Sequence, residues 1–304
     1  MTVHNLETPS INTLYPLNHL AIIEAAGDDV IQFLQGQLTC NIKELSDDKA
    51  SIAAFCNPKG RVISTLLIIK TEARFLLILP RSLLDKVLNK LKMYVLRSKV
   101  QLGDKSDALS LAGLDWPNTE LPLPTDDFQC RLLATGCLSI KLPSTTRRFL
   151  CIMDQATDAS GIFKDFIRGN GETWRYRDIS AGFPWFDLEQ SERHIPQMLN
   201  IDQLGGISFN KGCYTGQEIV ARTHYLGKAK RQLVLAECNR GLTMISNLSV
   251  KDAQTQEKIG EVLDLQALGE TTRLLIVLQT VDGEAKNLIL DDCEQTPVAL
   301  ISFQ

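Results

Sequence analysis

The last quarter of the chain, from Arg231 onward, shows no helical periodicity, and this limits the possible fold more than any other feature. Short apolar runs alternate there with glycine, aspartate and asparagine. Runs of this length between turn-forming residues are typical of β-strands. Residues 231–304 therefore predict a small β-barrel or β-sandwich. The expected strands are 233–237, 258–265, 273–281 and 298–303.

An earlier segment combines strands with a helix. Three segments have the residue pattern of strands, namely 51–56, 61–70 and 74–79. After them, Ser82 and Asp85 form a helix-start pair, and leucine and valine recur at three-and-four spacing over about four turns. Together with a strand near 99–102, this pattern predicts a small α+β unit inserted into the first domain. We expect boundaries near residues 48 and 104.

Composition excludes several classes of protein. Of the 304 residues, 44% are hydrophobic and 22% are charged, which excludes a mainly disordered chain. The net charge of −4 argues against a large surface for nucleic acid or anionic membrane. The eight cysteines have neither Cys-x-x-Cys nor zinc-site spacing, and no run resembles a signal peptide or membrane span. We expect a cytoplasmic protein with mostly buried, reduced cysteines.

The segment 204–222 is the most unusual in the chain, because four glycines surround a single cysteine, Cys213. Thr215 and Glu218 fit a capping box, and the apolar run 219–221 follows, which predicts a helix beginning at Gly216. Cys213 would then lie just ahead of a helix N-terminus. The partial positive charge there, with Lys211 as a charged neighbour, would favour the thiolate, the reactive form of cysteine.

Two interpretations of Cys213 remain open from the residues alone. Gly212 and Gly216 would permit unusual backbone angles and let a ligand approach closely, which suits an accessible thiol. Alternatively, a glycine-rich loop carries a chance buried cysteine, since neither His194 nor His224 can be placed beside the sulfur as a base.

Several motifs resemble one known family along nearly the whole chain. The run Lys211-Gly-Cys-Tyr-Thr-Gly-Gln-Glu218 resembles the signature of the YgfZ family, folate-binding proteins of tRNA modification that are relatives of the glycine-cleavage aminomethyltransferase. The other motifs that agree in order are 33–39 (FLQGQLT), 57–61 (NPKGR), 94–100 (YVLRSKV), 181–184 (AGFP) and 195–200 (IPQMLN).

The resemblance implies an α+β fold of the aminomethyltransferase type, a three-domain ring with tetrahydrofolate in a central hole. The expected units are a discontinuous folate-binding domain (1–48 plus 105–230), an inserted ferredoxin-like unit (49–104) and a C-terminal β-barrel (231–304). The family supports iron–sulfur enzymes, including tRNA methylthiotransferases, and its signature cysteine corresponds to Cys213. The accompanying motif residues are Gly212, Tyr214, Thr215, Gly216, Gln217 and Glu218. No family-wide catalytic turnover is implied.

The folate site carries over in part. Trp174 occupies a family tryptophan position, and a flat indole suits a pterin ring. Leu20 stands where relatives can have a second tryptophan, which changes the expected geometry of folate binding. Arg175 and Arg177 are candidate partners for the folate carboxylates. From composition alone, Trp174 and its neighbours equally fit an ordinary helix face.

Partners and alternatives follow from the same residues. Lys228, Lys230 and Arg231 form a small basic cluster, but three exposed cations usually form a solvated surface, so we expect direct tRNA binding to be weak or absent. We expect a monomer with no stably bound metal, because one signature cysteine cannot hold a cluster alone.

The alternative function is that of a folate-dependent aminomethyl or one-carbon transferase, although the corresponding segment of that enzyme resembles Lys-x-Asp-Phe-Ile-Gly. A third possibility is an interaction protein with a vestigial folate hole.

Overall fold

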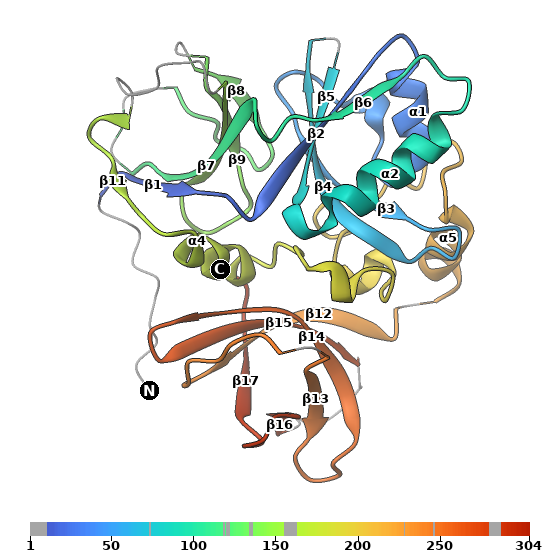
Figure 1. Ribbon diagram of the computed structural model, residues 1–304. Coiled ribbons are helices and arrows are strands. Elements are labelled where there is room, and N and C mark those ends of the chain that lie inside the picture. Colours follow the sequence, from blue (N-terminus) through green and yellow to red (C-terminus); the bar gives the residue numbers. More distant parts are fainter. Residues whose placement is uncertain are drawn as a thin grey trace.

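Two β-sheets and a closed β-barrel make up the molecule, and one short helix lies among them (Figure 1). The computed structural model describes residues 11–72, 74–117, 119, 122–133, 136–154, 163–227, 229–245, 247–279 and 287–304. In Figure 1 the two sheets lie side by side, and the barrel lies below them. The predicted α+β class is confirmed.

The C-terminal barrel closes in the order β12-β15-β14-β13-β16-β17, with antiparallel pairing throughout. Its interior is apolar, and Val250, Val262 and Ile276 are completely buried there. The predicted barrel is confirmed. The strands are β12 (Arg231–Cys238), β13 (Ser249–Asp252), β14 (Lys258–Leu268), β15 (Thr271–Gln279), β16 (Leu288–Leu290) and β17 (Pro297–Ile301). Residues 280 and 281 of the expected third strand lie outside the described part of the chain.

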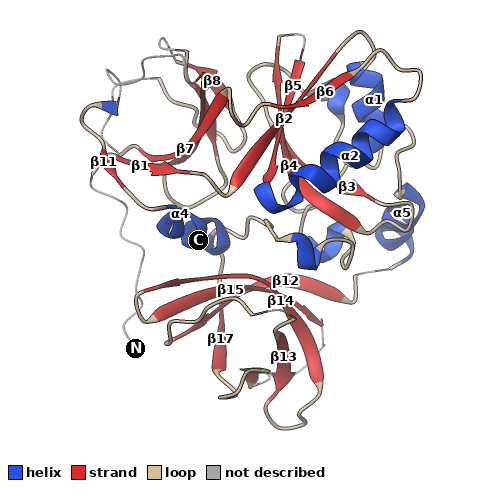
Figure 2. Cartoon of the chain, viewed as in Figure 1, coloured by secondary structure: helices blue, strands red, loops and turns tan. Residues whose placement is uncertain are grey.

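The five-stranded sheet has the order β3-β4-β5-β2-β6 and is buried on both faces. Along β2, Ala21 and Ile23 face a core shared with helices, whereas Leu20 and Ile22 face a core shared with the other sheet. Figure 2 shows the two helices, α1 and α2, beside this sheet. The elements are β2 (Leu20–Ala26), α1 (Val30–Gln37), β3 (Ser51–Cys56), β4 (Val62–Thr71), β5 (Arg74–Pro80), α2 (Leu84–Val95) and β6 (Gln101–Asp104).

This sheet is broader than the predicted inserted unit 49–104. Strand β2, from outside that range, pairs with both β5 and β6. A ferredoxin-like unit has the element order strand-helix-strand-strand-helix-strand, with four strands. This sheet is antiparallel throughout but contains one more strand. The general α+β description holds, and the boundaries near 48 and 104 stay a prediction.

The six-stranded sheet has the order β11-β1-β7-β10-β9-β8. Pairing is antiparallel except between β1 and β11, which run parallel. The strands are β1 (Thr13–Pro16), β7 (Leu109–Asp115), β8 (Cys130–Leu132), β9 (Leu138–Lys141), β10 (Arg148–Asp154) and β11 (Ile167–Arg168). The remaining helical segments of the described chain are η1 (Ile42–Glu44), η2 (Arg81–Leu83), α4 (Gly171–Ser180), η3 (Leu188–Gln190), η4 (Pro196–Leu199) and α5 (Gln217–Leu226).

The predicted amphipathic helix after residue 82 is confirmed as α2, but its predicted start is wrong. Leu84, Val87 and Leu91 are buried, as their spacing requires. The N-cap residue is Leu83, and no side chain caps the helix. The Ser82 hydroxyl instead donates to Asp187 Oδ1 at 2.9 Å. The candidate cap therefore makes a contact between distant parts of the chain.

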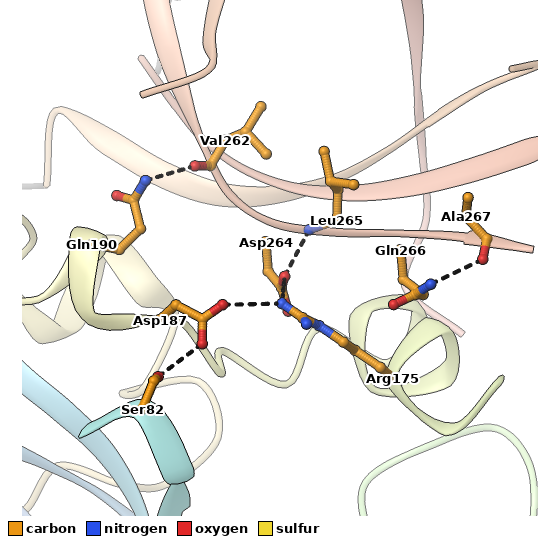
Figure 3. Close-up of polar contacts among 9 residues, drawn as sticks. All are labelled: Ser82, Arg175, Asp187, Gln190, Val262, Asp264, Leu265, Gln266 and Ala267. Carbon is orange, nitrogen blue, oxygen red and sulfur yellow. Dashed lines mark hydrogen bonds and ion pairs between the residues drawn. The ribbon is translucent and has the colours of Figure 1, made fainter. Parts of the chain in front are cut away.

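Helix α4 connects the sheets to the barrel (Figure 3). Arg175 donates through Nε to Asp264 Oδ2 of β14 at 3.2 Å, and a second nitrogen of its guanidinium reaches the other carboxylate oxygen. The same guanidinium lies 3.5 Å from Asp187, which accepts the Ser82 hydrogen bond. One arginine thus ties the barrel to the segment that contacts the five-stranded sheet.

No helix in the described part of the chain combines the length and the apolar character that crossing a bilayer requires.

His194 lies between the sheet region and the barrel and is only 2% exposed. Burial lowers the pKa of His194 to about 4. Glu261 on β14 opposes this shift, whereas Arg231, Arg193 and Arg61 lower the pKa further. The folded protein therefore holds this imidazole in its neutral form near pH 7.

We expect His194 to make the protein acid-sensitive. Its folded pKa of about 4 lies below the ordinary 6.5, so its contribution to stability is fully present above pH 6.5 and is lost as pH falls to 4. The free energy of unfolding should fall by about 3 kcal/mol over that range. Denaturant unfolding should show a much weaker dependence in His194→Gln, and an unchanged one in His224→Gln, where the imidazole is exposed. Equal acid sensitivity in all three proteins would contradict this assignment.

Candidate functional site

The predicted signature loop runs toward α5 and lies against the end of α1. The backbone N–H of Thr215 donates to the carbonyl of Gly36 at 3.1 Å, and that of Ser208 donates to the carbonyl of Thr39 at 2.9 Å. Motif segments far apart in the sequence therefore meet here. The sequence predicts no role for the motif 33–39. The structure shows that this motif supports the signature loop.

The side chain of Thr39 holds the start of the signature loop from within the core. Its completely buried hydroxyl donates to the carbonyl of Gly206 at 2.6 Å and accepts from the N–H of Ala54 at 2.8 Å. A buried hydroxyl with both roles satisfied fixes the positions of the chains that it joins. The loop thus begins at a defined distance from β3.

Gly216 allows the loop to approach the turn formed by the second quoted motif, 57–61. Its φ is +83°, and a Cβ there would lie 2.6 Å from the Asn57 carbonyl oxygen and 2.8 Å from Gly60 Cα. Any other residue would clash with backbone atoms that have no room to move. The expected freedom of Gly212 is not used, because its φ is not positive and open space surrounds it.

The predicted helix exists, but the predicted capping box does not. Helix α5 begins at Gln217 with Gly216 as its N-cap, and no side chain caps it. Thr215 Oγ1 instead faces Gln37 Oε1 at 3.5 Å, and Glu218 is exposed. Gln217 turns back toward the loop, where its Oε1 accepts from the N–H of Tyr214 at 3.3 Å.

Lys211 is buried beneath the loop and holds it to the chain after α1. Its Nζ donates to the carbonyl oxygens of Leu38 at 2.6 Å and Cys40 at 2.7 Å, and lies 5.0 Å from the ring centre of Tyr214. Burial lowers the pKa of Lys211 to about 8, and burial raises that of Cys40 to about 11. The ammonium group is therefore a structural anchor, and its action on the Cys213 thiol stays a prediction.

Cys213 is exposed, although Lys211 and Tyr214 on either side of it are buried. Burial also raises the pKa of the Tyr214 hydroxyl, which keeps that anchor neutral. All eight cysteines lie in the described part of the chain, and only Cys213 and Cys293 are exposed. The interpretation of Cys213 as a chance buried cysteine is wrong. A fixed loop presents its thiol to solvent.

Trp174 and Leu20 meet in one apolar cluster between the two sheets. Trp174 is completely buried, and a Cβ at Gly113 would lie only 2.3 Å from its indole. The Arg148 guanidinium lies 4.3 Å above the ring, and the Tyr15 ring centre is 5.6 Å away. The indole therefore has no open face for a pterin to stack on in this conformation.

The two candidate arginines for the folate carboxylates are engaged within the protein. Arg177 forms an ion pair with Asp115 at the end of β7, and Arg175 is paired with Asp264 and Asp187. Arg148, beside Trp174, is likewise paired with a carboxylate of α4. These cations are bound to carboxylates that the chain itself supplies.

Polar atoms near Leu20 and Trp174 nevertheless lack partners among the described residues. They are His19 Nε2, Trp174 Nε1 and Asp178 Oδ2. Burial lowers the pKa of His19, and the field of Asp178 partly offsets that shift, so these two side chains lie within electrostatic range. The indole geometry does not fit a stacked pterin, whereas these unpaired donors and acceptors fit a hydrogen-bonding heterocycle. Unpaired polar atoms, and not an open aromatic face, are therefore the groups that the chain offers to a ligand here.

No group of three or more His, Cys, Asp or Glu side chains in the described ranges is arranged to hold a metal ion. The expectation that no metal is bound stays a prediction.

Comparisons with known proteins agree with the resemblance in the motifs. The tRNA-modifying protein YgfZ of Enterobacter sp. (strain 638) is 33% identical over 313 residues, covering 96% of this chain and 93% of that protein. That of Escherichia coli O157:H7 is 33% identical over 290 residues, covering 91% and 88%. No protein-family model matches the chain.

The solved structures show the same architecture. The crystal structure of the glycine cleavage system aminomethyltransferase T from Bartonella henselae superposes with a TM-score of 0.73, covering 97% of this chain and 86% of that one. At 14% sequence identity this likeness shows the fold alone. Because curated relatives match at one residue in three over more than nine-tenths of its length, the chain belongs to the YgfZ family of tRNA-modifying proteins.

Proposed function

We propose that this protein is a cytoplasmic accessory factor of tRNA modification whose working group is the Cys213 thiol. It would support iron–sulfur enzymes such as tRNA methylthiotransferases without independent turnover of its own. The observation that carries the proposal is that Cys213 is exposed while the residues around it are fixed. Structural cysteines are usually buried, as six of the eight are here.

The geometry suits a thiol that meets another macromolecule. A nucleophilic or metal-accepting sulfur must be reachable, and its approach is most reproducible when the backbone on both sides is held rigidly. The buried side chains of Lys211 and Tyr214 hold the loop against the core, and the close contact of Gly216 with Gly60 fixes the point where the loop enters α5. Gly212 is exposed, and a Cβ there would meet no atom within 4 Å, so no other segment of the described chain covers the loop at this residue.

The proposal includes tetrahydrofolate for two reasons. The fold resembles that of an aminomethyltransferase, and polar atoms near Leu20 lack hydrogen-bond partners among the described residues. If it is bound there, it supplies a one-carbon carrier or a regulatory ligand. His19, Trp174 and Asp178 would hold its heterocycle through hydrogen bonds to the atoms that now lack partners. No step of the proposed action of the Cys213 thiol passes through the folate.

A folate-dependent aminomethyl transferase is the second candidate, favoured by the TM-score of 0.73 to such an enzyme. Formation of methylene-tetrahydrofolate from an aminomethyl donor would favour it over an accessory role.

Replacing the exposed thiol tests the main proposal. In a strain that lacks its own YgfZ-family protein, Cys213→Ala should fail to restore methylthiolated tRNA nucleosides, measured by mass spectrometry. The melting temperature should change little, because the removed sulfur is exposed. Cys293→Ala removes the other exposed thiol and should restore modification fully. Full rescue by Cys213→Ala would refute the assigned role.

Lys211→Met should loosen the loop without removing the thiol. The carbonyls of Leu38 and Cys40 would lose their common donor, and one lost hydrogen bond is worth about 1 kcal/mol. Because two such bonds are lost, amide hydrogen exchange over residues 205–216 should then be faster by about thirtyfold at pH 7. Lys43→Met removes an exposed lysine and serves as the control. Unchanged exchange in Lys211→Met would show that the buried amine does not hold the loop.

Calorimetric titration with tetrahydrofolate tests the ligand. We expect saturable binding that His19→Ala weakens, because this change removes an imidazole whose Nε2 lacks a partner beside Leu20. His224→Ala, far along the chain on α5, should bind normally. Absence of binding in the unaltered protein would leave the folate hole vestigial, and equal binding by both variants would place folate elsewhere.

A further inference from the structure

A large polar cavity lies at the junction of η4, α5 and the first strand of the barrel. Its volume is about 1130 Å³, and its lining includes Gln197 of η4, His224 of α5 and Arg231 of β12. Small-molecule sites commonly span about 300–1,000 Å³. The cavity is therefore large enough for a nucleotide together with part of a connected chain.

The inner wall of the cavity presents acceptors without partners. Gln197 is 8% exposed, and its Nε2 donates to the carbonyl of Val220 at 2.7 Å, which leaves Oε1 unpaired among the described residues. Asp202 Oδ1 is also buried without a partner, and burial raises the pKa of that carboxyl. A buried acceptor without a donor is costly. A ligand with N–H groups would remove this cost at both positions.

One side of the cavity carries an aromatic surface. His224 lines the cavity and stacks on Phe209, with ring centres 3.7 Å apart and planes 14° apart. Tyr225 contacts the same imidazole edge-on at 4.8 Å. Because His224 is exposed and lines the cavity, this aromatic group is within reach of a flat ligand.

Two cations also line the cavity. Lys230 is exposed and Arg231 is half-buried, and both line the cavity. Arg231 also interacts electrostatically with the Glu261 carboxylate, which balances part of its positive charge. We therefore expect Lys230 to attract an anion more strongly. The chain as a whole carries a net charge of −4, so attraction of an anion must come from such local groups. Lys228 lies outside the described residues.

We propose that this cavity binds a nucleotide whose base carries an amino group, with the base against His224 and the phosphate near Lys230 and Arg231. The acceptors favour a guanine, which offers a ring N–H and an adjacent amino group, over a uracil, which offers only one N–H. Flat base, donor edge and anionic phosphate are the three features that the walls match. This site is independent of the proposed thiol and folate functions.

The position of the cavity joins it to the signature loop. Its aromatic wall and the Cys213 loop are connected by the single helix α5, which begins at Gln217. At about 1.5 Å per residue, His224 lies roughly 10 Å along the axis from the start of that helix. A nucleotide in the cavity and a partner at the thiol could therefore occupy the protein together.

The experiment is a titration followed by NMR, with guanosine monophosphate, uridine monophosphate, inorganic phosphate and a five-nucleotide single-stranded RNA as probes. Guanosine monophosphate should bind saturably, in the millimolar range or tighter, and about fivefold more tightly than uridine monophosphate. His224→Ala and Lys230→Ala should each weaken it by about fivefold, since both side chains are exposed and removable without unfolding. Lys92→Ala, which removes an exposed side chain of α2, should leave it unchanged.

Tighter binding of the RNA than of the mononucleotide would support the proposal and identify RNA as the source of the nucleotide. The reverse order would support it with a free nucleotide as the source. Equal binding of inorganic phosphate and guanosine monophosphate would overturn it, because only an anion would be recognised. Absence of saturable binding, or binding indifferent to His224 and Lys230, would overturn it as well.

Discussion

The structure depends on charged side chains of α4, one buried and two half-buried, that lie where two sheets and a barrel meet. Arg175 reaches Asp264 in the barrel, Arg177 reaches Asp115 in the six-stranded sheet, and Asp178 pairs with Arg148 of the same sheet. Each charge loses water on folding, a cost that is offset only when its partner is well placed. These pairs therefore select one mutual arrangement of the three units more strongly than apolar contact alone would.

The same helix explains why the indole of Trp174 is closed to a stacking ligand. Trp174 lies one turn before Asp178, so the ion pair between Asp178 and Arg148 brings the guanidinium over the ring. Separating that pair to admit a pterin would expose or strand a buried charge, at a cost of about 3–5 kcal/mol. Unpaired polar atoms such as His19 Nε2 are at the same place. Hydrogen bonding is accordingly the less costly route for a ligand there.

Local patterns predicted the fold well where the interactions are local. Strand texture after Arg231 identified the barrel, and the spacing of Leu84, Val87 and Leu91 identified α2. Predictions failed where a side chain had two possible partners. Ser82 and Thr215 both fit helix caps by sequence, yet their hydroxyls face Asp187 and Gln37 in distant segments.

Long-range pairing was also hidden from the sequence. Nothing in residues 20–26 indicates that this strand inserts between β5 and β6. The sequence pattern of a strand determines which side chains share a face, but it does not determine which strands pair with it. The burial of Trp174 is hidden from the sequence for a related reason. Its partners, which include Gly113 and Arg148, come from distant strands of the six-stranded sheet.

The candidate site was easier to predict than its supports, because chemistry and packing place different demands on residue type. A single cysteine among glycines stands out in the sequence, whereas the roles of the residues that hold its loop do not. The Lys211 ammonium binds two backbone carbonyls, which any sequence would offer, and Thr39 is identified only by its buried position. Gly216 is the exception, since its positive φ and its contact with Gly60 exclude a Cβ. The exposed sulfur is thus held in place by interactions that carry almost no sequence signature, which is why its position had to come from the structure.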